Sequence, residues 1–363
     1  MNQVKKLLVA GILVACNTAF AQIDAPKYSN EFLDIGVSAR ALSMGNSVVA
    51  SVNDVTAGYW NPAGLLGMTG NIELSLMHAE YFAGIAKFDY AGLSARIDSN
   101  SVFGLTAIRF GVDDIPNTTE LIDASGNVNY DNITSFSAAD YAFLFTYARK
   151  LPIPGLQIGA NVKVIRMVVG DFAGAWGFGF DVGAQYKYKG WQFGAVGRDV
   201  TSTFNAWSYN LSPEMQAAFL ETGNTIPEDN VEVTLPRLLL GAAHSFTFWK
   251  QRLTLLPEVD ADLTFDGKRN TVISTNVVSV DPHAGFELGY KGMIFLRGGI
   301  GNIQQSTDVA GNPVTTVQPD FGVGIKIKSF SLDYALTNIG DASVALYSNV
   351  FSLKFDITKK THS

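Results

Sequence analysis

Apolar and polar residues alternate along most of this chain, in segments of roughly ten residues separated by gaps that are alternately short and long. In the last segment, from Phe351 to Ile357, every second residue is apolar and the residues between are polar. A period of two places the two sets on opposite faces of a β-strand. A soluble sandwich turns the apolar face inward, whereas a membrane barrel turns it toward lipid and lines its lumen with polar residues. The pattern predicts an all-β chain that forms a transmembrane antiparallel β-barrel.

About fourteen segments fit this pattern, an even number that lets both ends of the barrel wall lie on one side of the membrane. The predicted strands are 71–79, 85–97, 102–110, 140–151, 157–167, 175–188, 191–198, 237–247, 253–265, 283–290, 294–301, 320–327, 330–337 and 348–357. Short gaps, such as Lys189 and Gly190, are predicted periplasmic turns. The longer gaps are predicted external loops, namely 111–139, 199–236, 266–282, 302–319 and 338–347. The expected barrel domain is 71–358, followed by a periplasmic tail at 359–363.

The composition agrees with a barrel. Hydrophobic residues make up 47% of the chain. Outside the N-terminus no run reaches the roughly 18 apolar residues that a transmembrane helix needs. The 35 glycines, 24 phenylalanines and 13 tyrosines fit closely spaced strands with aromatic girdles. A soluble all-β protein of similar composition is the alternative.

The N-terminus has the features of an export signal. Lys5 and Lys6 precede an apolar stretch, and Ala19 and Ala21 form a small-x-small cleavage site. We expect 1–21 to be a signal peptide. The competing interpretation is a lipobox at 13–16, in which Cys16 would be acylated.

Cleavage after Ala21 would leave no cysteine, and therefore no thiol or disulfide chemistry. The net charge of the whole chain is −7, and it becomes more negative when the two signal lysines are removed. This balance argues against a nucleic-acid partner.

Two predicted external loops stand out. The first, 111–139, is acidic and rich in turn residues, as expected for a solvated loop. The second, 199–236, contains a predicted helix with Ser212 as its cap and Pro213 at its first position. The apolar face of this helix comprises Met215, Ala218 and Phe219. That face needs a cover. We favour the barrel mouth, and a partner or an apolar ligand is the alternative.

The segment before the first strand, 22–70, is too long and too apolar to be a tail. Fourteen strands complete the wall without it. Its apolar residues can then be buried only inside the lumen, so we expect this segment to be a hatch or plug.

Three motifs in this segment carry a family resemblance. The sequence SARALSMG at 38–45, the pair Asn53-Asp54, and WNPAGL at 60–65 resemble the opening of the PorV/PorQ family of Bacteroidota outer-membrane proteins. That family is itself similar to the FadL long-chain fatty-acid transporters, which share the Asn-Pro-Ala tripeptide. The hatch motif residues are Arg40, Gly45, Asn53, Asp54, Trp60, Asn61, Pro62 and Ala63.

The resemblance implies a fourteen-stranded, FadL-like barrel in the Gram-negative outer membrane, in contact with the lipid bilayer and lipopolysaccharide. In the PorV branch it implies an accessory or shuttle role in the type IX secretion system. Such a protein would bind secreted cargo and translocon or attachment-complex proteins through its external loops. The stretch 32–40 leans toward PorQ and 59–63 toward PorV, so the branch stays open. The alternative function is a FadL-like transporter of hydrophobic small molecules, which implies a hydrophobic ligand. A diffusion porin is disfavoured by the apolar plug.

Catalytic and metal-binding patterns are not found. The four histidines have no metal-ligand spacing, and no Ser-His-acid set stands out, so we expect neither an enzyme nor a cofactor. Glu258, Asp260 and Asp262 share one strand face, which in principle suits a hard cation. We favour a row that lines the lumen and pairs with basic residues. The inward candidates are Lys163, Arg297, Lys326 and Lys354.

Pro257 lies in the middle of a predicted strand, where it removes one ladder hydrogen bond. In the FadL relatives a strand kink opens a lateral window for apolar cargo. A bulge or a proline near a strand end is the simpler explanation, and we favour it.

Overall fold

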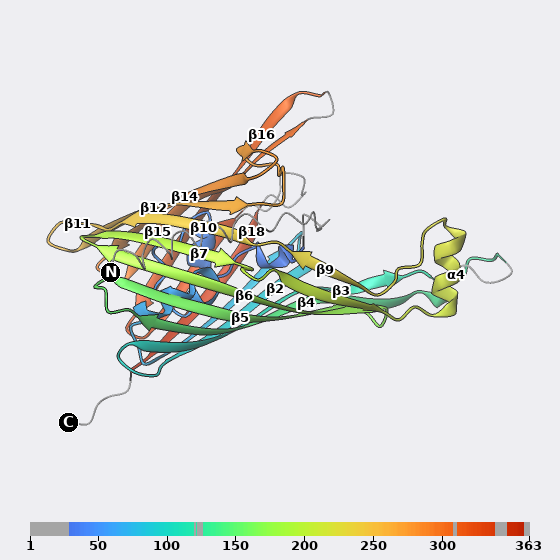
Figure 1. The fold of residues 1–363 in the computed structure, drawn as a ribbon, viewed down its shortest axis with the longest axis horizontal. Helices are drawn as coiled ribbons and strands as arrows, with labels where there is room; N and C mark the ends of the chain where they lie inside the picture. The colour runs from blue at the N-terminus through green and yellow to red at the C-terminus, as the bar shows by residue number, and fades with distance from the viewer. Residues whose placement is uncertain (1–28, 120, 122–125, 308–310, 338–346, 359–363) are drawn as a thin grey trace, which may run out of the picture.

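The computed structural model describes residues 29–119, 121, 126–307, 311–337 and 347–358. Its strands form one antiparallel sheet that closes on itself, with the N-terminal helices inside (Figure 1). The strands are β1 (Ile72–Tyr81), β2 (Ala86–Arg96), β3 (Ser101–Asn117), β4 (Thr134–Lys150), β5 (Leu156–Val169), β6 (Ala173–Tyr188), β7 (Trp191–Arg198), β8 (Thr203–Tyr209), β9 (Asn230–Thr234), β10 (Arg237–His244), β11 (Phe246–Phe248), β12 (Leu253–Thr264), β13 (Ile273–Ser274), β14 (Ser279–Tyr290), β15 (Ile294–Thr307), β16 (Pro313–Ile327), β17 (Phe330–Thr337) and β18 (Ser348–Ile357). The helices are η1 (Glu31–Leu33), α2 (Ala39–Ser43), α3 (Ala57–Trp60), η2 (Pro62–Gly67), η3 (Tyr130–Asn132) and α4 (Pro213–Glu221).

The wall has fourteen strands. β7 and β8 pair in succession with β6 and act as one wall strand. β9, β10 and β11 follow one another as a second composite strand, and β13 is a two-residue strand in a connection. Pairing of β1 with β18, with Leu74 opposite Phe355, closes the barrel. The predicted antiparallel barrel is confirmed.

The two faces of the wall differ as the alternation predicts. In β6, Trp176, Phe178 and Phe180 are 53%, 57% and 45% exposed on the outer face. Glycines between them, such as Gly177 and Gly179, face the lumen. Among the described residues, no helix is long and apolar enough to cross a membrane.

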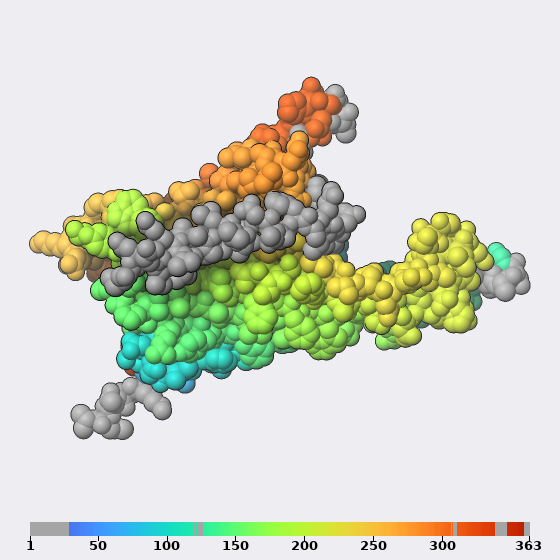
Figure 2. Space-filling model, viewed as in Figure 1, coloured from blue at the N-terminus to red at the C-terminus, as the bar shows by residue number. Residues whose placement is uncertain are grey.

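Several predicted loops are in fact strand. β3 and β4 have 17 residues each against 10 in β1 and β18, so much of 111–139 continues the sheet. The same is true within 199–236, which contains β8 and β9, and within 302–319, which β15 and β16 largely fill. The alternating pattern did not reveal these extensions. A sheet outside the membrane needs no lipid-facing side, so its residues need not alternate between apolar and polar. The extensions within 111–139 and 199–236 form an arm that projects beyond the barrel body and carries α4, whereas β15 and β16 form a separate projection (Figures 1 and 2).

Residues 29–70 lie inside the barrel and form the main hydrophobic core. Val37, Met44, Val48, Trp60 and Leu65 are all nearly inaccessible to solvent. The segment fits because inward wall positions are glycine: a Cβ on Gly183 would lie 2.3 Å from Asn61 Oδ1, and one on Gly299 would lie 2.1 Å from the Met44 carbonyl carbon. We call residues 29–70 the hatch. The signal peptide at 1–21, Cys16, residues 22–28 and the tail at 359–363 lie outside the described residues.

Candidate functional site: the hatch and the lumen

Two buried carboxylates of β12 hold an irregular stretch of the hatch. Asp260 Oδ2 accepts a hydrogen bond from the Val49 N–H at 2.9 Å. Glu258 Oε1 accepts from the N–H groups of Ala50, at 2.7 Å, and Ser51, at 3.2 Å. These N–H groups belong to no helix or strand, so the carboxylates supply the partners that buried backbone requires.

The basic residues expected beside these carboxylates pair elsewhere. The ion pairs are Lys163 with Asp181 (2.9 Å) and Asp199, Arg297 with Glu287 (2.7 Å) and Asp333 (2.6 Å), Lys326 with Asp356 (3.0 Å), and Lys354 with Asp54 (2.7 Å). The expectation that lysine or arginine would pair with Glu258 and Asp260 was therefore wrong. The hatch backbone occupies the position in which those cations were expected.

Ion pairs tie the hatch to separate parts of the wall. Arg40 Nε lies 2.9 Å from Glu287 Oε2, and Asp34 accepts two hydrogen bonds from the Arg237 guanidinium. Asp54 Oδ2 lies 2.7 Å from Lys354 Nζ. Burial opposes ionisation of Asp54, but the Lys354 ammonium outweighs it and holds the pKa of Asp54 well below its usual range.

The WNPA motif forms the sharp turn that leads into η2. Trp60 Nε1 donates to the Val37 carbonyl at 2.9 Å. The Asn61 side chain accepts from the Ala63 N–H at 3.2 Å and donates to two carbonyls, those of Val49 (2.9 Å) and Ala184 (3.1 Å). Pro62 then packs against the inward glycines of β5 and β6, and Ala63 is fully buried. The motif therefore fixes the hatch both to itself and to the wall.

The remaining motif residues have local roles. Gly45 has φ +62°, and a Cβ there would lie 2.7 Å from the Ile300 carbonyl oxygen of β15. Only glycine allows this approach in that conformation. Asn53 is exposed and packs against the backbone of Gly67. The structure thus brings seven of the eight motif residues into the buried interior or its ion pairs.

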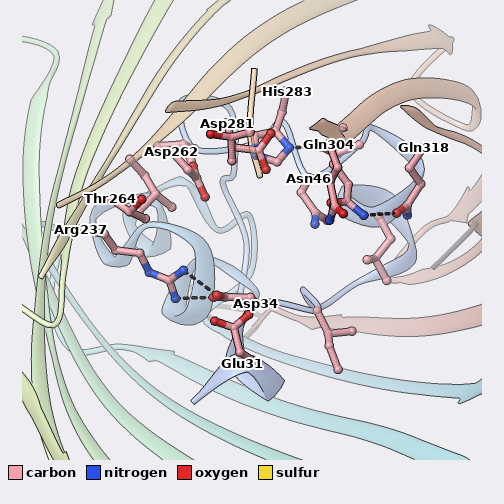
Figure 3. A pocket seen from close by; sticks show the side chains of 18 of the residues that line it. Glu31, Asp34, Asn46, Arg237, Asp262, Thr264, Asp281, His283, Gln304 and Gln318 are labelled. Atoms are coloured by element: carbon pink, nitrogen blue, oxygen red, sulfur yellow. Dashed lines mark hydrogen bonds and ion pairs between the residues drawn. The ribbon is translucent and has the colours of Figure 1, made fainter. Parts of the chain in front are cut away.

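A cavity of about 510 Å³, lined by both polar and apolar residues, lies between the hatch and one half of the wall. Figure 3 shows Asp34 of the hatch facing Arg237, with Asp262, Asp281 and His283 along the wall. His283 Nδ1 lies 3.1 Å from the Gly45 carbonyl oxygen. Within the described part of the chain no group of three or more His, Cys, Asp or Glu residues is arranged to hold a metal ion.

The other half of the inner wall contains an apolar cluster on β2 to β5, which the sequence pattern did not predict. Phe88 and Phe110 are paired across β2 and β3, with ring centroids 6.2 Å apart. Met167 of β5 is buried in the same cluster, and Trp207 of β8 packs against it. The available signal was the inward parity, which is mostly apolar in β2 to β4 and at Ile165 and Met167 of β5, and charged in β12 to β16.

No family model and no curated protein matches this chain. Several solved structures are similar to it. The toluene transporter TbuX of Ralstonia pickettii has 14% identity and a TM-score of 0.52, covering 89% of this chain and 98% of that one. The toluene transporter TodX of Pseudomonas putida has 13% identity and a TM-score of 0.54, with 90% and 99% covered. A FadL homologue of Pseudomonas aeruginosa has 13% identity and a TM-score of 0.53, with 88% and 98% covered.

The chain has the FadL-type barrel fold. At these identities the likeness extends to the fold of outer-membrane FadL-type barrels, and it does not single out the PorV/PorQ family.

In this FadL-type barrel, α4 does not cover the mouth. It lies at the tip of the projecting arm (Figures 1 and 2). Ser212 caps the helix as expected, accepting from the Met215 N–H at 3.3 Å. Met215, Ala218 and Phe219 are only half-buried, and Leu220 is 64% exposed. The expectation that this face folds back over the barrel was wrong, because the strand extensions carry the helix away from the lumen.

Pro257 forms neither a window nor a bulge in the FadL-type wall. β12 pairs with β14 without a break, with Pro257 opposite Phe286. On the other side of β12 the ladder is interrupted between β10 and β11. The pairs Ala243–Glu258 and Phe246–Leu255, which flank the interruption, nevertheless share one register. The favoured explanation, a bulge or a strand end at Pro257, was therefore wrong. The interruption between β10 and β11 accommodates Pro257, which has no N–H to donate.

A second hollow, of about 480 Å³, lies on the outer face of the FadL-type wall across β18 and β1 to β4. Its floor contains Ala91 and Ala107, and Phe143 and Phe351 flank it. β2 and β3 pair behind it without a break, so the hollow does not open into the lumen.

Proposed function

We propose that this chain is an outer-membrane channel for small hydrophobic molecules, with the hatch as its closing element. The observation that carries the proposal is a FadL-type barrel whose lumen is filled by a segment outside the sheet. Proteins of this fold include transporters named for toluene and a FadL homologue. The arm would face outward, and the opposite end of the barrel would face the periplasm.

The division of the inner wall supports an apolar ligand. Phe110, Val112 and Trp207 are partly accessible beside the hatch, and they adjoin buried Phe88 and Met167. An apolar solute gains free energy there by leaving water, at roughly 25 cal/mol per Å² of buried surface. Water and polar groups would occupy the polar half.

The contacts that hold the hatch are compatible with movement. Besides apolar packing they are hydrogen bonds and ion pairs, and each hydrogen bond contributes a net of about 0.5–1.5 kcal/mol because water can replace it. A shift of the segment would connect the apolar half with the periplasmic end.

Uptake tests the proposal. Cells that lack their own FadL-type channel and express this chain should take up labelled toluene or labelled long-chain fatty acid. Phe110→Asp, which places a charge in the apolar half, should reduce uptake several-fold, whereas Gln318→Ala in the polar half should not. Uptake no greater than that of cells with an empty vector, with a folded barrel in the outer membrane, would rule the channel out.

No enzymatic activity and no cofactor belong to this proposal. Transport through such a barrel requires only binding and a movable hatch.

A second candidate is the accessory role in type IX secretion that the family resemblance implies. The arm favours it, because α4 presents a half-exposed apolar face away from the barrel. Cargo and translocon or attachment proteins would bind there. Affinity capture from detergent-solubilised outer membranes should then recover a large translocon subunit or a sortase-like protein. Deletion of 211–224 should abolish that capture and leave uptake unchanged.

A further inference from the structure

Exposed basic residues surround one end of the barrel, the end formed by the six short connections at 97–100, 151–155, 189–190, 249–252, 291–293 and 328–329. Five of these connections contain or adjoin an exposed lysine or arginine. These residues are Arg149, Lys150, Lys189, Lys250, Arg252, Lys291 and Lys328, and we call them the basic rim. The six connections together contain one acidic residue, Asp98.

The basic rim is not neutralised by the protein. Among the residues that the structure describes, none of its seven side chains forms an ion pair with a carboxylate. Their charges are therefore available to an anionic partner.

Backbone geometry makes the choice of lysine informative. Lys189, Lys250, Lys291 and Lys328 have φ values of 47°, 54°, 53° and 54°. The tight turns in this left-handed conformation favour Gly, Asn or Asp. Lysine accepts a conformational disadvantage at each of these four turn positions.

Aromatic side chains lie beside the lysines. Lys189 Nζ is 5.1 Å from the centroid of the Tyr188 ring, and Lys291 Nζ is 5.3 Å from that of Tyr290. Trp249, next to Lys250, is 67% exposed. Tyrosine and tryptophan concentrate where a membrane meets water, so the basic rim lies at the level of the lipid headgroups.

The other end of the barrel has the opposite character. The stretches 110–148 and 199–236, which build most of the arm, contain no lysine or arginine. These stretches of the arm thus carry no positive charge, whereas the basic rim spreads positive charge around the circumference of the other end.

We propose that the basic rim binds the phosphate groups of anionic phospholipids in the leaflet that faces the periplasm. The inference rests on the orientation given under the proposed function. Clustered lysine and arginine at a membrane surface attract anionic headgroups, and the attraction falls with ionic strength. A ring of charge around a barrel matches a surrounding shell of lipids better than it matches a single compact protein.

The test uses the full mature chain in nanodiscs containing equal amounts of phosphatidylcholine and phosphatidylglycerol. Native mass spectrometry should find phosphatidylglycerol enriched several-fold among the lipids that remain bound. The quadruple variant K189Q/K250Q/K291Q/K328Q should lose most of this enrichment. The matched quadruple Lys→Arg variant should keep it, and K87Q at the opposite end of the barrel should have no effect.

Heat-modifiable migration in gels establishes that each variant is a folded barrel. Equal retention of the two lipids by the wild-type protein, or enrichment that survives in the quadruple Gln variant, would overturn the inference. Enrichment of an acidic periplasmic protein without any lipid preference would also overturn it. Uptake of hydrophobic molecules is measured on the same variants, so that failure of the channel function is distinguishable from failure of lipid binding.

Discussion

At the scale of single residues, wall carboxylates hold the hatch by accepting hydrogen bonds from its backbone. Glu258 and Asp260 do so from β12, and Glu73 of β1 does so for Val55 (3.1 Å) and Thr69 (2.8 Å). A carboxylate can accept several such bonds at once, and a charged acceptor makes each of them stronger. The hatch is thereby fixed without joining the sheet.

Glu258→Ala should loosen the hatch, because two buried N–H groups lose their acceptor. Each unpaired group costs about 1–3 kcal/mol. Hydrogen–deuterium exchange of residues 45–55 should therefore become faster, while exchange in β1 and β18 stays unchanged. Glu80→Ala, at an exposed position on the outer face, is the control. Unchanged exchange in 45–55 would show that Glu258 does not secure the hatch.

The Asp54–Lys354 pair predicts a pH dependence. The pKa of Asp54 is lower in the folded protein than the unfolded value of about 3.9, so the pair adds stability above that pH. This stability is lost as the pH falls through the lower, folded pKa.

Exchange in the hatch should accordingly rise in strong acid, and Asp54→Asn should remove part of that rise. Lys354→Met at neutral pH leaves a buried carboxylate unpaired and should destabilise the hatch by about 3–5 kcal/mol. A pH profile of exchange identical in wild type and Asp54→Asn would contradict this account.

At the scale of elements, strand length separates the membrane wall from the arm. β1, β2 and β18 have 10 or 11 residues, which suffices for a tilted membrane-spanning strand of about 9–11 residues. β3 and β4 exceed this by about six residues, and their extra length pairs into the arm. The connections at the two ends of these strands should therefore lie on opposite sides of the membrane.

Protease-site insertion tests that topology. A site placed between Lys189 and Gly190 should be protected in intact cells, and one placed beside Gly126 should be cut. A Cβ on Gly126 would meet no atom within 4 Å, so the insertion there has room. Both sites should be cut once the outer membrane is permeabilised. Equal cleavage of both sites in intact cells would refute the assignment.

At the scale of the whole molecule, the hatch is both the core and the closure of the barrel. The buried apolar residues concentrate in the lumen, whereas the large apolar side chains of the wall face outward. Strand pairing is continuous around the barrel without any contribution from the hatch. The wall can therefore close while the lumen is open.

Deletion of 41–58 should leave a folded, heat-modifiable barrel of reduced stability and open a path for water through the lumen. Planar bilayers should then show stepwise conductance, where the intact protein shows little. The inward glycines that now contact the hatch would line this path. A folded deletion variant that does not conduct would mean that the remaining residues close the lumen.

The sequence by itself determined the barrel, because alternation between apolar and polar residues is a local property with a period of two. It located all fourteen wall strands. It also indicated that 22–70 had to be buried inside, since a complete wall left no other place for its apolar residues.

Only the tertiary structure decided which residues meet across the lumen. Arg40 and Glu287 are 247 residues apart, and Ala50 and Glu258 are 208 apart. Such contacts depend on the register of every strand around the closed sheet and on the path of the hatch, and neither is encoded in a two-residue period. For the same reason the sequence predicted the wrong partners for Glu258 and the wrong position for α4. It also left unseen the division of the inner wall into an apolar and a polar half.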